Sequence, residues 1–276
     1  MIAHQYGIWW SVDMVVAIML FGLVVGSFLN VIILRVPLHR SIVSPPSTCM
    51  SCGTRIKMYD NIPVLSWLML RGRCRTCKSW ISRRYIFIEL NTALFFGIVA
   101  EKFPTNAPFL LIAFLVLAAS TIALALIDFD THTLPDKILL PSICVGAWLL
   151  TMDEAVTPQH RALLRALFGL CTLALFYFSL TLIYPGGMGM GDVKFAGLLG
   201  FYLAYLGWEE LLVATFFTFI LAALFALALI YFRGANRKTE IPFGPWMVTG
   251  SWIGIIFGAT IFNQYLSLFG LAHHVS

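Results

Sequence analysis

Two acidic stretches could do chemistry in this chain of 276 residues, most of which are apolar. One is "GGMGMGDVKF" at 186–195, in which glycines precede a single acid, Asp192. The other is "ALIDFDTHTLPD", which ends a long apolar block and has Asp128 as its first acid. Two carboxylates that converge in a partly dry site share a proton, and such a pair can activate water against a carbonyl. Asp128 and Asp192 are therefore candidates for an acid–base pair.

The residues beside Asp192 suit this chemistry. Gly189 and Gly191 carry no side chain, so a substrate backbone could approach the acid closely. Lys194 either steadies the carboxylate of Asp192 or extends its ammonium to the membrane–water interface. A glycine-rich run is also typical of phosphate loops and of flexible joints. We interpret the other polar residues near Asp128 as helix caps or solvent-facing groups: Asp130, His132 and Asp136.

Four of the six cysteines lie in the polar segment 35–84, as "CMSC" at 49–52 and "CRTC" at 74–77. Two CxxC pairs at this separation are typical of a tetrahedral site in which four thiolates hold one zinc ion. The predicted ligands are Cys49, Cys52, Cys74 and Cys77. A loop without much core would depend on the ion for its fold, so we expect the zinc to be structural.

The alternative for these cysteines is two disulfides or two redox-active pairs. The predicted cytoplasmic side of this loop disfavours disulfides, because thiols stay reduced there. Gly53 and Gly72 are expected to permit the tight turns of the two knuckles. The remaining cysteines, Cys144 and Cys171, lie alone in apolar blocks and are interpreted as packing residues.

Long apolar blocks must position these groups, since 60% of the residues are hydrophobic and only 11% are charged. A soluble domain would have about a quarter of its positions charged. We therefore predict an all-α polytopic membrane protein, with about eight transmembrane helices and a cytoplasmic zinc-binding loop. The expected spans are roughly 14–34, 85–100, 107–127, 138–152, 162–183, 193–206, 209–232 and 247–270. Three of them (85–100, 138–152 and 193–206) are shorter than the ~20 residues that a bilayer requires.

Basic residues predict the orientation, because cytoplasmic loops are enriched in Lys and Arg. An N-terminus outside the cytoplasm puts fifteen of the 18 Lys and Arg residues on the cytoplasmic side, ten of them in 35–84. It also puts Asp128 and Asp192 at the same membrane face. The net charge of +5 then reflects membrane orientation, and we expect no nucleic-acid partner. The start, "MIAHQYGIWW", has no Lys or Arg, so we expect no cleaved signal peptide.

Several motifs occur in an order and spacing that is highly specific. They are "GSFLNVIILRVP" at 26–37, "DNIPVLSWLMLRGRC" at 60–74, "ISRRYIFIE" at 81–89, "ALIDFDTHTLPD", and the GxGD motif of Gly189, Gly191 and Asp192. Together they resemble the bacterial prepilin leader peptidases of type IV pilus and type II secretion systems. The resemblance implies a membrane aspartic endopeptidase of the bacterial inner membrane, with Asp128 and Asp192 as the two catalytic acids at the cytoplasmic face and the N-terminus periplasmic.

The resemblance also implies substrates and a second activity. Family members cut the basic leader from prepilins and pseudopilins, typically after a glycine. Members with the tetracysteine loop usually also methylate the new N-terminal amine, with S-adenosylmethionine as the donor. This chain has Met50 and Ile86 where the family commonly has proline. Both departures lie in the region linked to methylation, and neither touches the aspartate pair.

Three parts follow from these predictions: a first transmembrane segment at 1–34, the cytoplasmic zinc loop at 35–84, and a transmembrane aspartic protease core at 85–276. One alternative is an intramembrane GxGD protease of the presenilin and signal-peptide-peptidase type, which would cut within a transmembrane helix. Another is a transporter with a zinc-stabilised loop and paired acids as a proton relay. A transporter should have acids near mid-span and often internal repeats, whereas here the acids lie at span ends.

Overall fold

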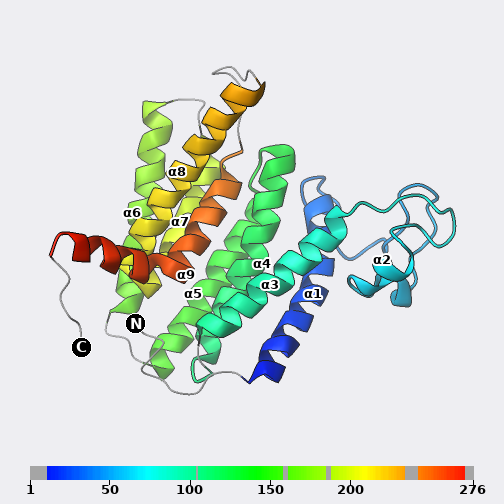
Figure 1. Ribbon diagram of the computed structural model, residues 1–276, viewed down its shortest axis with the longest axis horizontal. Helices are drawn as coiled ribbons and strands as arrows, with labels where there is room; N and C mark the ends of the chain where they lie inside the picture. Colours follow the sequence, from blue (N-terminus) through cyan, green and yellow to red (C-terminus); the bar gives the residue numbers. More distant parts are fainter. Residues whose placement is uncertain (1–10, 104, 158–160, 185–187, 234–241, 271–276) are drawn as a thin grey trace. The chain divides into compact units, whose positions relative to one another are not determined.

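The computed structural model describes residues 11–103, 105–157, 161–184, 188–233 and 242–270 (Figure 1). These residues form helices without any strand, which confirms the predicted all-α fold class. The elements are α1 (Val12–Arg35), η2 (Met58–Asn61), α2 (Leu65–Met69), α3 (Arg84–Lys102), α4 (Pro108–Thr131), α5 (Asp136–Val156), α6 (Ala162–Ile183), α7 (Met190–Leu206), α8 (Trp208–Arg233) and α9 (Gly244–Leu268).

Six of these helices are long and apolar enough to cross a membrane: α1, α4, α5, α6, α8 and α9. The chain is therefore a multi-pass membrane protein. The other two predicted spans coincide with α3 and α7, which have 19 and 17 residues. Helix α7 extends only about 26 Å at 1.5 Å per residue, less than a typical ~30 Å hydrocarbon core. The count of eight spans stays a prediction.

The chain divides into two compact units, Ile2–Ala123 and Leu124–Ser276, with the boundary inside α4. The first unit contains the cysteine loop, and the second contains Asp128 and Asp192. The division into 1–34, 35–84 and 85–276 stays a prediction. Some predicted features lie outside the described residues: the N-terminal decapeptide, Gly186, Gly187, and the basic residues Arg237 and Lys238.

In the first unit, α1 and α3 run side by side at very close range (Figure 1). A Cβ added to Gly26 would lie 2.7 Å from the Cα of Glu89, and one added to Gly22 would lie 2.8 Å from the Cα of Ala93. Glycines four residues apart thus let the two backbones touch, which is the usual way that membrane helices pack without a hydrophobic driving force.

Replacing Gly26 with valine should push α1 away from α3. Overpacking of this kind costs about 1–3 kcal/mol, so thermal unfolding of the purified protein in detergent should shift to a lower temperature. Ala17→Val, at an exposed position of the same helix, is the matched control and should leave the transition in place. An equal shift in both variants would contradict the close α1–α3 contact.

In the second unit, α6 packs against α7 and α8 against α9. Gly169 and Gly200 meet at the α6–α7 crossing, where neither has room for a Cβ. At one end of this pair the guanidinium of Arg165 donates to the carbonyls of Ala204, Tyr205 and Leu206, at 2.5, 2.6 and 3.0 Å. These carbonyls have no partner within the helix, so Arg165 both caps α7 and ties it to the start of α6.

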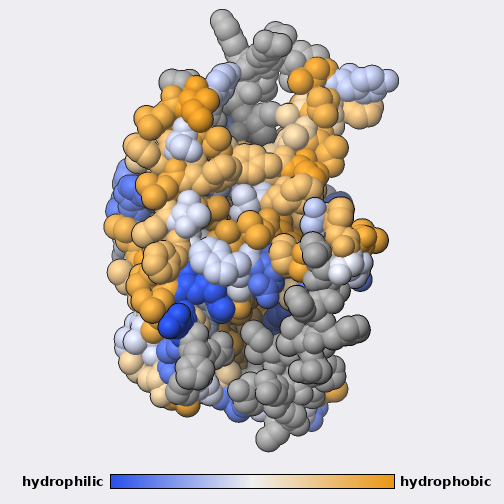
Figure 2. Space-filling view, turned by 90° about the vertical axis from the view of Figure 1, so that its left-hand side faces the viewer, coloured by the Kyte–Doolittle hydropathy of each residue, from blue (hydrophilic) through white to orange (hydrophobic). Residues whose placement is uncertain are grey.

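The outer faces of the helices expose large apolar side chains, as expected for contact with lipid. Phe168 and Leu175 on α6 are 64% and 65% exposed, and Phe216 and Leu227 on α8 are 61% and 62% exposed. Figure 2 shows that hydrophobic residues cover most of the coloured surface in its upper part. Apolar surface on this scale is found where a protein meets a membrane or another protein.

Candidate functional site

Four helix ends meet at one end of the second unit. They are the end of α4 and the starts of α5, α7 and α9. An ion pair between Lys194 and Asp136 joins α7 to α5, and a hydrogen bond between Gly244 and Asp128 joins α9 to α4. The topology therefore brings the two predicted acids, 64 positions apart in the sequence, to the same end of the helices.

Asp128 lies in the last turn of α4 and is only 5% exposed. Its Oδ2 accepts a hydrogen bond of 2.8 Å from the backbone N–H of Gly244, the first residue of α9. The N–H groups in the first turn of a helix lack partners and carry partial positive charge, so this arrangement favours a carboxylate. A Cβ on residue 244 would come within 2.7 Å of the same oxygen, so only glycine fits there.

Asp192 is the third residue of α7 and is partly buried. Its Oδ2 accepts a hydrogen bond of 2.9 Å from the backbone N–H of Gly189, so the carboxylate reaches back to cap its own helix. The charge of Asp192 acts on Asp128, and it also acts on the buried phenol of Tyr177. Asp128 thus lies against the N-terminus of α9, and Asp192 lies at the N-terminus of its own helix, α7. Each acid is within the electrostatic range of the other.

The three residues near Asp192 that were predicted to assist it have different surroundings: Gly189, Gly191 and Lys194. A Cβ on Gly191 would come within 3.1 Å of Leu134, so this glycine allows α7 to pack on the segment before α5. Gly189 is exposed, and a Cβ there would make only ordinary contacts at 3.8 and 3.9 Å. Lys194 places its ammonium 2.8 Å from a carboxylate oxygen of Asp136, a partner that the sequence did not suggest.

An aromatic cluster lies close to the two acids. The ring of Tyr177 lies 5.7 Å from that of Phe219 and 6.0 Å from that of Phe243, and Phe243 directly precedes Gly244. Sequence reasoning missed both Gly244 and Tyr177. A signal for Gly244 is present in the "FGPW" run, since proline at the start of a helix marks an N-terminus with unpaired N–H groups. Tyr177 has no such signal, because it is one of many aromatics in an apolar block.

The four predicted cysteine ligands come together in the first unit. The sulfur atoms of Cys49, Cys52, Cys74 and Cys77 all lie within 4.8 Å of one another. The Sγ atoms of Cys49 and Cys77 are 3.8 Å apart. Tetrahedral zinc with Zn–S bonds of about 2.3 Å requires sulfur atoms about 3.8 Å apart. The donor set and its spacing therefore fit one zinc ion.

Both CxxC pairs adopt the same turn. The N–H of the first cysteine bonds to a carbonyl five residues later, and its carbonyl accepts from the residue four later. That fourth residue has positive φ in both turns, being Gly53 (+69°) in one and Lys78 (+59°) in the other. Gly72 also has positive φ (+67°) in the turn before the second pair, as predicted, and a Cβ there would come within 2.6 Å of the Trp67 ring.

The surroundings of Cys49 and Cys77 favour thiolates, whereas desolvation and the neighbouring thiols of Cys49 and Cys77 raise the pKa of Cys74. The backbone N–H groups of Cys52 and Ser51 and the hydroxyl of Ser79 lower the pKa of the Cys49 thiol to about 6. The Ser79 hydroxyl, 3.1 Å from the Cys77 sulfur, also lowers the pKa of Cys77. Thiolates are the form that coordinates metal, so both turns are organised as ligands before any ion binds.

Comparison with known protein families matches two consecutive segments of the chain, which together cover most of residues 20–227. Residues 20–103 match the bacterial peptidase A24 N-terminal domain, and residues 109–227 match the type IV leader peptidase family. The first match contains the cysteine loop, and the second contains both acids. The chain belongs to the type IV leader peptidase family.

Relatives support this assignment over their whole length. A protein of Pseudomonas putida named prepilin leader peptidase/N-methyltransferase is 35% identical over 90% of this chain and 92% of the relative. Proteins of the same name from Aeromonas salmonicida (35% identical, 91% of this chain and 93% of the relative) and Pseudomonas aeruginosa (33%, 93% and 94%) are similar to a comparable extent. No solved structure matches the chain.

Proposed function

We propose that this protein cleaves the leader peptide from prepilins or pseudopilins and methylates the new N-terminus. Family membership gives the reaction class. The observation that carries the proteolytic part is the position of Asp128 and Asp192 at the same end of the helices, each held by a backbone N–H at a helix N-terminus. Fixed hydrogen bonds keep the two carboxyl groups in place before substrate arrives, which lowers the cost of reaching the reactive geometry.

In the proposed mechanism the two acids share one proton. The ionised carboxylate takes a proton from water as the water oxygen bonds to the scissile carbonyl carbon, and the protonated acid donates to the carbonyl oxygen. The tetrahedral intermediate then breaks its C–N bond, and a proton transferred to the nitrogen releases the amine. The aromatic cluster of Tyr177, Phe219 and Phe243 would keep bulk water away from one side of this pair.

The acids' position along the helices supports cleavage at a membrane face. Asp128 lies three residues before the end of α4, and Asp192 lies in the first turn of α7. A prepilin leader is hydrophilic and basic, so it would meet the pair at the interface. The excess of Lys and Arg in 35–84 supports assigning this face to the cytoplasm and the N-terminus to the periplasm. We propose the bacterial inner membrane as the location.

Zinc and a methyl donor complete the proposal. Cys49, Cys52, Cys74 and Cys77 would hold one zinc ion, whose role is to fix the fold of the loop. Among residues 35–84 only Val36, Ser66 and Gly72 are buried, so the loop has little core of its own. S-adenosylmethionine would be a second substrate that supplies the methyl group to the free amine. We assign the loop to methylation and 85–276 to proteolysis.

Incubation of the purified protein with a prepilin, with and without S-adenosylmethionine, tests both activities at once. Mass analysis should find the mature pilin, and with the donor the same product heavier by one methyl group on its N-terminal amine. A cut within the apolar segment of the pilin would instead favour the intramembrane protease alternative. Absence of any cut under conditions in which a relative cleaves the same prepilin would contradict the proposal.

Gly244→Ala should slow leader cleavage about 100-fold, the cost expected when a catalytic group moves by about 1 Å. The added methyl would collide with Oδ2 of Asp128, so the carboxylate must move or lose its hydrogen bond. Gly197→Ala is the matched control, because a Cβ there would make only ordinary contacts of 3.6 Å or more. Equal cleavage rates for both variants, measured at saturating prepilin, would argue against this role of Gly244.

A further inference from the structure

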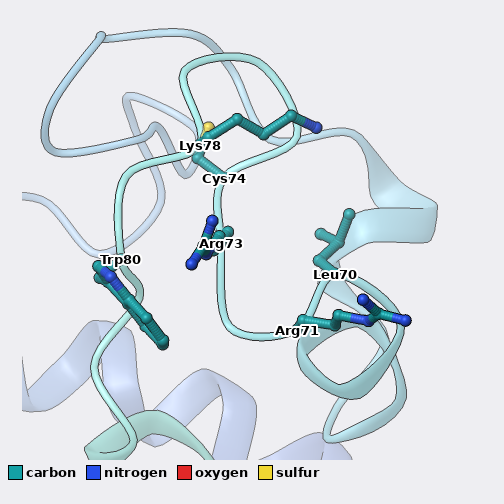
Figure 3. A pocket seen from close by; sticks show the side chains of 6 residues that line it. All are labelled: Leu70, Arg71, Arg73, Cys74, Lys78 and Trp80. Atoms are coloured by element: carbon teal, nitrogen blue, oxygen red, sulfur yellow. The ribbon is translucent and has the colours of Figure 1, made fainter.

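A pocket in the loop is lined entirely by residues of the first unit, and one of them is Cys74 of the thiol cluster. Its volume is about 340 Å³, and it is lined by Leu70, Arg71, Arg73, Cys74, Lys78 and Trp80. Figure 3 shows Trp80 on one side and Leu70 with Arg71 on the other, with the side chain of Arg73 between them. We call these six residues the basic pocket.

The backbone around the basic pocket is firmly held. Arg73 and Trp80 pair as an antiparallel bridge, and the N–H of Ile81 bonds to the carbonyl of Gly72 at 2.8 Å. The indole N–H of Trp67 on α2 donates to the carbonyl of Ile81 at 3.2 Å. Since Gly72 lies directly against the Trp67 ring, α2 and the second cysteine turn form one body.

The basic pocket keeps an excess of positive charge, although four thiolates on one Zn²⁺ beside it would carry a net charge of −2. It contains three cations, Arg71, Arg73 and Lys78, and all three residues are exposed. Asp60 is the one acid in 35–84, and its carboxylate is held by the guanidinium of Arg75 at 2.6–3.0 Å. A ligand here should therefore be an anion. S-adenosylmethionine, with its sulfonium and ammonium groups, and a basic leader peptide are both disfavoured by Coulomb repulsion.

Apolar side chains surround these cations. On α2, Leu65, Leu68 and Met69 are 57%, 57% and 81% exposed, and Trp80 is 70% exposed. Segments that lie in the interface of a membrane have this composition: exposed leucine and methionine on a short helix, next to arginines and a tryptophan. The guanidinium of Arg73 lies 4.9 Å from the Trp80 ring, a distance at which a cation and an aromatic face attract each other.

Part of the loop lies beside the C-terminal half of α1. Ile42 and Pro46 line a second cavity together with α1 residues from Val24 to Arg35. Val24 and Arg35 are about 16 Å apart along the axis of α1, so the loop folds back along α1. The N–H of Val64 donates to Glu89 Oε2 of α3 at 2.7 Å, and α2 starts at the next residue. Helix α2 is thus tethered beside the first two turns of α3.

We propose that the basic pocket binds the phosphate of an anionic phospholipid of the surrounding membrane, while the apolar side chains of α2 enter the interface. Arg71, Arg73 and Lys78 would donate to the phosphate oxygens, and Trp80 would lie at the level of the head groups. This contact would fix the loop against the bilayer independently of whether the protein is a peptidase.

Native mass spectrometry of the full-length zinc-loaded protein, in uncharged detergent with phosphatidylglycerol or phosphatidylcholine, tests the inference. We expect the wild type to prefer phosphatidylglycerol. The Arg71→Gln/Arg73→Gln/Lys78→Gln variant should bind it on the order of 100-fold more weakly, since each basic residue near an anionic surface contributes roughly a factor of five. The Arg40→Gln/Arg55→Gln/Lys57→Gln variant removes the same charge elsewhere in the loop and should bind nearly as wild type.

Three results would overturn the inference: equal weakening in both triple variants, no preference over phosphatidylcholine, or unchanged binding by the pocket variant. Glycerophosphoglycerol and inorganic phosphate distinguish the sources of the anion. If either compound displaces phosphatidylglycerol at a concentration no higher than that at which the intact lipid binds, the ligand is a free phosphate. The proposed contact with a membrane lipid would then be wrong. If the triple variant loses its zinc, the single variant Arg71→Gln replaces it as the test, because Arg71 lies before the cysteine turn. Arg71→Gln should weaken binding of phosphatidylglycerol about fivefold.

Discussion

The Asp192→Asn and Asp128→Asn variants should each cleave the leader at least about 10³-fold more slowly, because general acid and general base catalysis each contribute about 10²–10⁴-fold. Asparagine has nearly the same shape as aspartate, and its carbonyl oxygen can still accept the N–H of Gly189 or of Gly244. The hydrogen bonds that hold each residue would therefore remain. The loss would come from the missing proton transfer.

The measurement is the initial rate of prepilin cleavage by each variant, purified from membranes in equal amount. Asp130→Asn is the control, since Asp130 is exposed two residues after Asp128 and its replacement should leave measurable activity. Cleavage at the wild-type rate by either the Asp128 or the Asp192 variant would remove that acid from the mechanism. Loss of activity in all three variants would point to a general effect of charge at this end of α4.

The Cys74→Ser/Cys77→Ser variant should lose about one equivalent of zinc and its methyltransferase activity, while keeping most of its leader cleavage. The loop has almost no buried residues, so its fold should depend on the ion. The two acids belong to the other compact unit and are held by hydrogen bonds within that unit. Removing the zinc should therefore disturb methylation more than proteolysis.

Metal analysis and the two product masses, measured on the same preparation, check this expectation. Cys144→Ser/Cys171→Ser is the matched control, because it also replaces two free cysteines but leaves the cluster intact. It should keep zinc and both activities. If the Cys74→Ser/Cys77→Ser protein is inserted in the membrane and yet does not cleave, the loop is part of the protease, and the proposed separation of roles is wrong.

Local patterns in the sequence predicted the elements well. Long apolar blocks became helices, because a chain in lipid must pair every backbone N–H and carbonyl within itself. The CxxC spacing predicted the two thiol turns, since the geometry of each turn depends on adjacent residues only. The GxGD run likewise ended at a helix start, with Asp192 capping its own α7. In each case the determining contacts lie within a few residues.

What the sequence by itself determined is thus the helices, the thiol turns, and the placement of Asp128 and Asp192 at helix ends. Only the tertiary structure decided which ends meet. Gly244 donates to Asp128 across 116 positions, and Lys194 pairs with Asp136 across 58. Such partners depend on how helices cross, and crossings depend on shape complementarity over many small contacts. No short pattern encodes that choice, because the same glycine or lysine fits equally well at the end of any other helix.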